Sequence, residues 1–463
     1  MELIYQVKDR PPFFRNLLLG LQQVLAIIAG TITLPLIVGN GMSQSAALLG
    51  AAIGSIIYLL FTKFKSPVLL GSSFSFIGPM SYAFAGAATV MMGYSGLLIG
   101  AILIGIVYIG LAIAVKFAGT DWLNKVMPPV IIGPTVAIIG LSLAPQAIQN
   151  LSKGSVLDAA SNPVAHPLLC IFIGLIVLFT VAIISIYGKK MLRMVPFIIG
   201  ILVGYIVATI FTEIGLATGN EQLQIIDFSL YENIQWLPEL SCIKGIKGFS
   251  DFANANEFFK YFGIVALSYI PVSFVSFAEH IADHKNLSFI IGSDLLKDPG
   301  LTRSLLGDGI GSIVGATIGG CPNTTYGESI SCVAFSKNAS TFTLLTASII
   351  SIGIAFIGPL MTFFATIPTC VVGGISICLY GFIATSGFRM FKDLDFNKPK
   401  NIIIVSTILV AGVGGLVINI EKFVVSPVAV SLILGILMNL VLNIKTKKKE
   451  TDSPQINKDE ETK

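Results

Sequence analysis

The chain has 463 residues, of which 54% are hydrophobic and only 12% are charged, and its mean hydropathy is +0.85. A soluble domain carries about a quarter of charged residues, so this composition excludes a soluble globular protein and indicates a polytopic membrane protein. The net charge of +4 follows from where the basic residues lie relative to the membrane, as shown below, and does not indicate a nucleic-acid partner. The six cysteines form neither a disulfide framework nor a metal-ligand spacing.

Apolar stretches long enough to cross a bilayer, about 20 residues each, recur along the whole chain. Fourteen such spans are predicted, several of them short or interrupted by Gly and Pro, near residues 17–38, 45–62, 67–83, 94–115, 128–145, 167–187, 195–212, 262–284, 304–319, 321–336, 341–361, 366–386, 401–420 and 424–443.

The basic residues follow the positive-inside rule if the N-terminus is cytoplasmic. All but five of the 29 lysines and arginines then fall on the inner side, and the five exceptions are Lys153, Lys244, Lys247, Lys260 and Lys422. The protein is therefore predicted to lie in the cytoplasmic membrane with both of its ends in the cytoplasm. The first span is expected to act as an uncleaved insertion signal.

Fourteen spans divide into two halves of seven, and an odd number per half inverts the second half relative to the first, as in many secondary transporters. Internal similarity supports this division, because PPVIIG at 128–133 resembles PTCVVG at 368–373 in the corresponding span. The predicted domains are a first repeat at 1–213 (spans 1–4 core, 5–7 gate), an extracytoplasmic loop at 214–260, a second repeat at 261–444 (spans 8–11 core, 12–14 gate) and a disordered basic and polar tail at 445–463.

The third and tenth spans correspond in this scheme, and both are interrupted. They read SPVLLGSSFSFIGPM and GGCPNTTYGESISC, rich in residues that weaken helices. Non-helical backbone at membrane depth is tolerated where it lines a cavity or is buried in protein, so the pair indicates a transport site; two kinked packing helices are the alternative.

Four acidic residues lie within the predicted spans: Glu279, Asp283, Asp308 and Glu328. A carboxylate at bilayer depth costs about 2.5–3.5 kcal/mol on insertion scales, so such residues normally face a cavity. Glu279 and Asp283 are four apart and share one helix face. Glu328 and Phe74 stand where apolar sequence resumes after each interruption, so helix N-termini there would add unpaired N–H donors.

Carboxylate acceptors beside backbone donors suit a flat, neutral ligand with ring N–H and carbonyl groups, such as uracil or xanthine. An inorganic anion is disfavoured as the ligand because no basic residue is predicted within the spans. A bare metal ion is disfavoured because hard cations usually bind more oxygen ligands than these residues offer. Burial favours the protonated form of a carboxyl group, so Asp283 and Asp308 are candidates for proton coupling. The alternative for Asp308 is a structural hydrogen bond to the backbone of a neighbouring span. Gln23 is expected to support the site, and His284 to lie at the membrane interface.

Six motifs along the chain resemble the nucleobase–ascorbate transporter family, and NTTYGE resembles its bacterial uracil permease branch. They are GLQQVLAIIAG, GSSFSFIGP, PPVIIGP, FAEHIAD, DLLKDPGLTRSLLGDGIGS and CPNTTYGESIS. The resemblance implies an all-α fold of fourteen spans with a core domain, a gate domain and two short antiparallel strands in the third and tenth spans. It also implies proton-coupled uptake of a base and pairing of two copies into a homodimer.

Carried over position by position, the resemblance implies a set of substrate-binding residues. Glu279 and Glu328 would bind the base, and the amides of Phe74 and Gly327 would donate to its carbonyls. Tyr326 would pack on the ring, and Gly30 and Tyr380 would line the pocket less directly. The chain departs from uracil permeases of the best-described type at Gln23 and Asp283, where they have His, and at Ser329, where Asn is usual.

A uracil–proton symporter working by alternating access is the leading prediction, with no catalytic residues and no cofactor. A xanthine or other purine carrier of the same family is the main alternative, since Asp283 and Asp308 both occur in purine-transporting relatives. An anion transporter of related fold, a channel and an integral membrane enzyme are more remote; the last lacks a nucleophile–base arrangement in the sequence.

Overall fold

The computed structural model describes residues 3–119, 128–158, 162–189, 192, 196–232, 234–392, 394–420, 423–425 and 427–451. The first half of the chain forms α1 (Phe13–Val38), α2 (Gln44–Phe61), β1 (Leu70–Ser72), the 3-10 turn η1 (Phe74–Phe76), α3 (Ile77–Ala85), α4 (Val90–Ala118), α6 (Pro129–Leu151), α7 (Pro167–Tyr187) and α8 (Pro196–Thr218).

The segment between the halves contains three short 3-10 turns and one helix, which are η3 (Glu221–Leu223), η4 (Phe228–Tyr231), α9 (Ser241–Gly248) and η5 (Phe249–Asp251). The second half forms α10 (Ala255–Ile291), the π-helical turn η6 (Leu296–Gly300), α11 (Leu301–Gly319), β2 (Asn323–Thr325), α12 (Gly327–Ser336), α13 (Thr341–Ala355), α14 (Gly358–Ala365), α15 (Thr369–Met390), α16 (Pro399–Val413), β3 (Ile418–Ile420), β4 (Phe423–Val425) and α17 (Pro427–Thr451).

Within the described residues, eight helices are long and apolar enough to cross a membrane, namely α1, α2, α4, α6, α7, α8, α10 and α15. A ninth is reached if α13 and α14 count as one broken span. These two helices bend by 80° at their junction, so the eleventh span, expected over 341–361, is a bent one. The five other expected spans correspond to the interrupted third and tenth segments, to α11, and to the shorter α16 and α17.

The interruptions in the third and tenth spans are confirmed as strands. β1 and β2 pair antiparallel, with Leu70 opposite Thr325 and Ser72 opposite Asn323. The pairing satisfies backbone groups that no helix could satisfy here, and the Ser55 hydroxyl completes it by accepting from the Leu70 N–H at 2.8 Å. Each strand is followed by helix, which restarts at η1 and α3 in the first half and at α12 in the second.

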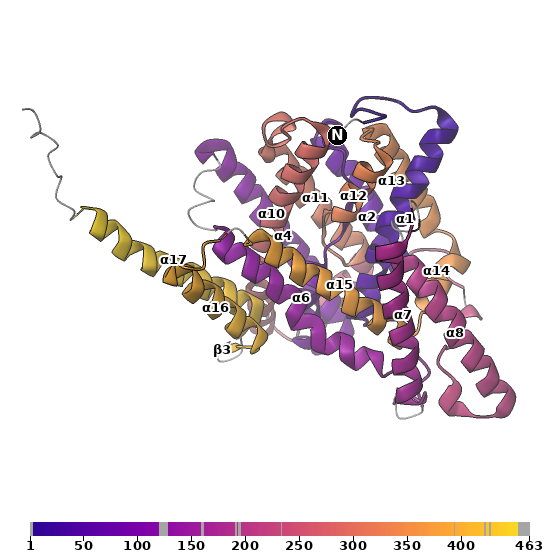
Figure 1. Ribbon diagram of the computed structural model, residues 1–463. Coiled ribbons are helices and arrows are strands. Elements are labelled where there is room, and N and C mark those ends of the chain that lie inside the picture. Colours follow the sequence, from indigo (N-terminus) through magenta and orange to yellow (C-terminus); the bar gives the residue numbers. More distant parts are fainter. Residues whose placement is uncertain are drawn as a thin grey trace, which may run out of the picture.

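The helices pack into two groups. One contains α1–α4 and α10–α13, and the other contains α6–α8 and α15–α17. Figure 1 shows α6 and α15 side by side across the front of the molecule, with α7 and α8 at one end of this layer and α16 and α17 at the other. α17 is helical through Thr451, seven residues into the predicted tail; residues 452–463 of that tail lie outside the described residues.

Close approach of glycines holds each group together. Gly50 and Gly54 of α2 face Gly315 and Gly311 of α11, and a Cβ on Gly50 would lie only 2.6 Å from the Gly315 carbonyl oxygen. Small residues at such spacing let two membrane helices pack backbone to backbone. This contact places α11 directly behind the two strands.

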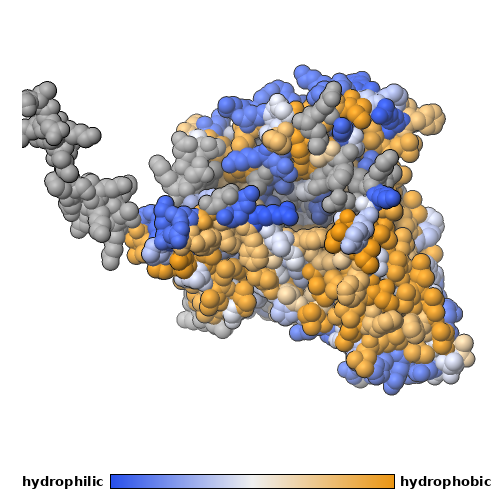
Figure 2. Space-filling view, viewed as in Figure 1, coloured by the Kyte–Doolittle hydropathy of each residue, from blue (hydrophilic) through white to orange (hydrophobic). Residues whose placement is uncertain are grey.

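The outer surface of the second group is apolar, as expected for a surface facing lipid. Along α7 the exposed large side chains recur at helical spacing: Leu168, Phe172, Leu175, Phe179, Ile183 and Ile186. Figure 2 shows this broad apolar face between polar regions above and below it. The chain is therefore an integral, multi-pass membrane protein.

Candidate functional site

A cavity of about 580 Å³ lies between the two helix groups. The first group contributes polar residues from η1, α10, β2 and α12, and the second contributes mainly apolar residues from α6 and α15. Its lining comprises Ser73, Phe74, Ser75, Val136, Glu279, Asp283, Asn286, Thr324, Thr325, Tyr326, Gly327, Glu328, Leu379, Phe382, Ile383, Arg389 and Met390.

The cavity face of α10 carries three polar residues. Glu279, Asp283 and Asn286 are spaced i, i+4 and i+7, so they lie one above another on one side of the helix. The Ser75 hydroxyl donates to Glu279 Oε2 at 3.4 Å, and the Thr325 hydroxyl donates to Asp283 Oδ2 at 2.9 Å. Glu279 is thus hydrogen-bonded to a residue of η1 and Asp283 to a residue of β2, and both carboxylates line the cavity.

Glu328 reaches the same cavity from the first turn of α12. This helix starts at Gly327, and Tyr326 before it provides no side-chain cap. The first N–H groups of a helix have no intrahelical acceptor and carry partial positive charge. Gly327 itself lines the cavity, so the start of α12 lies at the cavity wall. Phe74 begins η1 and lines the cavity too, so the structure brings both predicted backbone donors to it.

Tyr326 is buried, and its ring packs where two glycines leave room. A Cβ on Gly71 would lie 2.5 Å from the Tyr326 ring, and one on Gly30 would overlap the Tyr326 hydroxyl. Gly30 therefore lies behind the tyrosine and is not among the cavity-lining residues. Tyr380 lines a separate apolar cavity of about 160 Å³ between α6 and α15.

Gln23 also lies behind the cavity. Its Oε1 accepts from the Ser329 hydroxyl at 3.0 Å, and the same hydroxyl accepts from the Leu69 N–H at 3.1 Å. Gln23 on α1 and Ser329 on α12 thus connect to the segment that leads into β1. Gln23 and Ser329, which both differ from the residues usual in uracil permeases, are therefore hydrogen-bonded to each other.

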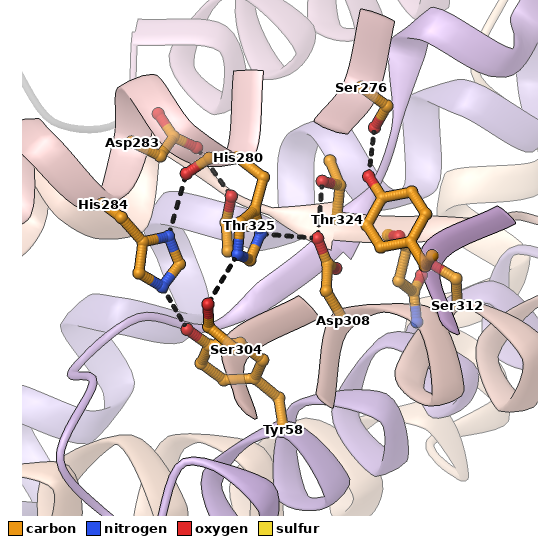
Figure 3. A network of polar contacts seen from close by, with 12 residues as sticks. Tyr58, Ser276, His280, Asp283, His284, Ser304, Asp308, Ser312, Thr324 and Thr325 are labelled. Carbon is orange, nitrogen blue, oxygen red and sulfur yellow. Dashed lines mark hydrogen bonds and ion pairs between the residues drawn. The ribbon is translucent and has the colours of Figure 1, made fainter. Parts of the chain in front are cut away.

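Asp308 does not line the cavity. It is fully buried on α11, where its Oδ2 lies 2.7 Å from His280 Nδ1 and accepts from the Thr324 hydroxyl at 3.3 Å (Figure 3). These partners are side chains, in contrast to the backbone partner considered as an alternative.

His284 was expected at the membrane interface, and that prediction is wrong. The side chain is 1% exposed, and its Nε2 lies 2.7 Å from the Tyr58 hydroxyl (Figure 3). Its Nδ1 donates to the His280 carbonyl at 2.9 Å. The helix continues to Ile291, so His284 lies within α10 and not at its end.

The sequence reading missed Arg389, Asn286 and Thr325. Arg389 stands in the last turn of α15, beyond the predicted span 366–386, and lines the cavity, so a basic residue borders the site although none lies within the predicted spans. Asn286 could have been found, because it continues the i, i+4, i+7 stripe begun by Glu279. Arg389 could not, because its position next to the cavity depends on how α15 packs.

A second cavity, of about 450 Å³, lies beyond Ser75 on the other side of the Glu279 level. Its lining is neutral, with Ser142, Gln146 and Gln149 from α6 among its polar members. Ser75 lines both cavities. Among the described residues, no group of three or more His, Cys, Asp or Glu side chains is arranged to hold a metal ion.

The family model described as "Permease family", for xanthine and uracil permeases, matches residues 14–421. The chain belongs to this family. It is similar to a uracil permease of Bacillus caldolyticus, at 35% identity over 95% of this chain and 94% of that protein. A uracil permease of Bacillus subtilis is 34% identical over 97% of both chains. The resemblance to nucleobase transporters is thus confirmed, and the protein is a nucleobase permease and not an enzyme.

A solved structure shows that the permease shares its fold with a wider group. The transmembrane domain of the cyanobacterial bicarbonate transporter BicA superimposes with a TM-score of 0.61, covering 94% of this chain and all of that domain. The two are 14% identical, so this likeness concerns the fold alone.

Proposed function

We propose that the permease imports uracil together with protons. The observation that carries the proposal is the convergence of the Glu279 and Glu328 carboxylates with the helix starts at Phe74 and Gly327 on one cavity. Uracil is flat and neutral and carries two ring N–H donors and two carbonyl acceptors. The carboxylates would accept from its N–H groups, and the backbone N–H groups would donate to its carbonyls.

Two further observations support this substrate and this mode of transport. The relatives named above are uracil permeases at about a third identity over nearly the whole chain. The two cavities that meet at Ser75 lie on opposite sides of the Glu279 level, which suits alternating access around one site. In this proposal the first helix group is a core that carries the site, and the second is a gate that moves against it. Both belong to a fourteen-span inverted repeat with cytoplasmic termini.

A purine base such as xanthine is the second candidate. The cavity of about 580 Å³ is large enough for a two-ring base, and Asp283 extends the row of acceptors one helical turn beyond Glu279. The gate side of this cavity is formed by Leu379, Phe382 and Ile383, which would contact the ring faces of either base.

The test is uptake of radiolabelled uracil into proteoliposomes that contain the purified permease. An acidic exterior should drive accumulation that a protonophore abolishes, and unlabelled uracil should compete better than xanthine. Stronger competition by xanthine would assign the purine, and accumulation that ignores the pH gradient would refute proton coupling.

A further inference from the structure

His280 on the buried face of α10 pairs with Asp308 of α11, an acid separate from the carboxylates that line the cavity. His280 Nδ1 and Asp308 Oδ2 are 2.7 Å apart, and both side chains are 0% exposed. His280 Nε2 lies 3.0 Å from the Ser304 hydroxyl, while Asp308 Oδ1 has no hydrogen-bond partner among the described residues (Figure 3). The pair joins α10 to α11 and is closed off from lipid and from bulk water.

Proton counting shows what this pair can hold. With a neutral imidazole and an ionised Asp308 it carries one negative charge, and one carboxylate oxygen has no donor. One additional proton makes it neutral, whether the proton stays on Asp308 or on His280 Nδ1. An isolated buried charge is costly, so the neutral form is strongly favoured whenever water is excluded.

A single hydroxyl connects this pair to the cavity. Thr324 lines the cavity, and its Oγ1 donates to Asp308 Oδ2 at 3.3 Å. A hydroxyl can take an excess proton from a hydronium ion in the cavity on its lone pair and pass its own proton to the carboxylate, which leaves neutral water behind and needs no movement of heavy atoms.

Other titratable groups face the pair, but each is already engaged. The Tyr58 hydroxyl binds His284, whose ring stacks on His280 at 4.1 Å, and the Tyr108 hydroxyl donates to Ser276. On the remaining sides, Glu279, Asp283 and Glu328 line the cavity, where water, a ligand and Arg389 can offset their charge. The His280–Asp308 pair is fully buried, and among the described residues no lysine or arginine forms an ion pair with Asp308.

We propose that the proton transported with the base resides on the His280–Asp308 pair and reaches it through Thr324. The open cavity beside Thr324 is the nearest polar space to the pair, and closing it removes the solvation that reaches the charged form through Thr324, so closure favours the protonated pair. The inference rests on the proposed proton-coupled uptake and assigns the coupled proton to a site distinct from the residues that bind the base.

The test compares two assays on the same proteoliposomes: accumulation driven by a pH gradient, and uracil counterflow, which needs no net proton movement. Asp308→Asn keeps an amide that can donate to His280 Nδ1 but cannot bind the proton. We expect its ratio of accumulation to counterflow to fall at least tenfold. An unchanged ratio, or equal loss of both activities, would overturn the proposal.

Thr324 supplies the second variant and its controls. Thr324→Val removes the hydroxyl at nearly constant volume and should lower the same ratio at least threefold, whereas Thr324→Ser should restore it. Thr135→Val is the matched control, because this buried hydroxyl bonds only to the Ile131 carbonyl of its own helix. A ratio that falls equally in Thr135→Val and Thr324→Val would refute the route. If the wild-type permease itself ignores the pH gradient, the proposed symport is wrong and the assignment falls with it; if the wild type responds to the gradient and Asp308→Asn keeps its ratio, only the assignment of the pair is wrong.

Discussion

Two faces of α10 carry polar side chains, and the two faces differ in how many hydrogen-bond partners the rest of the protein provides. On the buried face, Ser276, His280 and His284 each bond to a side chain of another helix in the first group. On the cavity face, Glu279 and Asp283 accept one hydroxyl each from the described part of the chain, at 3.4 and 2.9 Å. The difference teaches that polar residues within one membrane helix can serve separate purposes: one set fixes the helix among its neighbours, and the other keeps acceptors open for a ligand.

Removing the central residue of the buried face should have the largest effect. His280→Leu leaves the Asp308 carboxyl and the Ser304 hydroxyl buried without this partner, so we expect a loss of about 3–5 kcal/mol in stability. Thermal unfolding of the purified permease in detergent measures it. His166→Leu is the control, because this exposed side chain bonds only to the Leu168 N–H. Equal melting temperatures for the two variants would contradict the role given to the buried face.

The largest effect on the cavity face should fall on binding and not on stability. Glu279→Gln replaces one carboxylate oxygen with an N–H₂ donor that opposes the ring N–H of the base. Uracil affinity should drop at least 100-fold, or by about 2.8 kcal/mol. Calorimetric titration of the purified variant measures this, with Glu213→Gln on exposed α8 as the control. Wild-type affinity in Glu279→Gln would exclude this carboxylate from the site.

Tyr58→Phe tests the far end of the buried face. The change removes the hydroxyl that lies 2.7 Å from His284 Nε2 and 2.8 Å from Ser66 Oγ. Ser66 Oγ and His284 Nε2 would keep only their mutual contact of 3.4 Å, so the loss of two shorter hydrogen bonds should cost about 1.5 kcal/mol of stability. Tyr187→Phe, on an exposed ring, should leave the melting temperature unchanged. A wild-type melting temperature for Tyr58→Phe would show that this end of the network does not hold α10 in place.

Ser276→Ala should have the smallest effect. It removes the acceptor of the Tyr108 hydroxyl, a neutral hydrogen bond of 3.1 Å whose loss should cost about 1 kcal/mol. Uracil affinity should stay within a factor of two of wild type, and exposed Ser406→Ala is the stability control. A large fall in affinity would mean that the two faces are not independent.

The organisation of the site was largely predictable because it depends on local rules. Helix-breaking residues at 67–83 and 321–336 predicted interrupted spans, and the structure has β1 and β2 there. The spacing of Glu279 and Asp283 put both on one face, where the cavity lies. The same 3.6-residue period puts His280 and His284 on another face. Only the position of His284 next to Lys285 suggested an interfacial residue, and the continuation of α10 to Ile291 overrode it.

Contacts between distant segments were not predictable in this way. Arg389 follows the apolar part of α15 and reads as a cytoplasmic anchor, yet the packing of α15 on α6 brings it to the cavity. Asp308 reads as a candidate for proton coupling, like Asp283, but the glycine contact between α2 and α11 holds α11 behind the strands, so Asp283 lines the cavity and Asp308 does not.

By itself the sequence determined that the protein is embedded in a membrane, where its helices break and which helix face carries the acids. These follow from hydropathy, backbone preferences and helical periodicity, which act over a few residues. Only the tertiary structure decided which acid meets the cavity and which meets a histidine. Side chains separated by tens of residues in sequence, such as His280 and Asp308, acquire their partners only when the helices that carry them pack together.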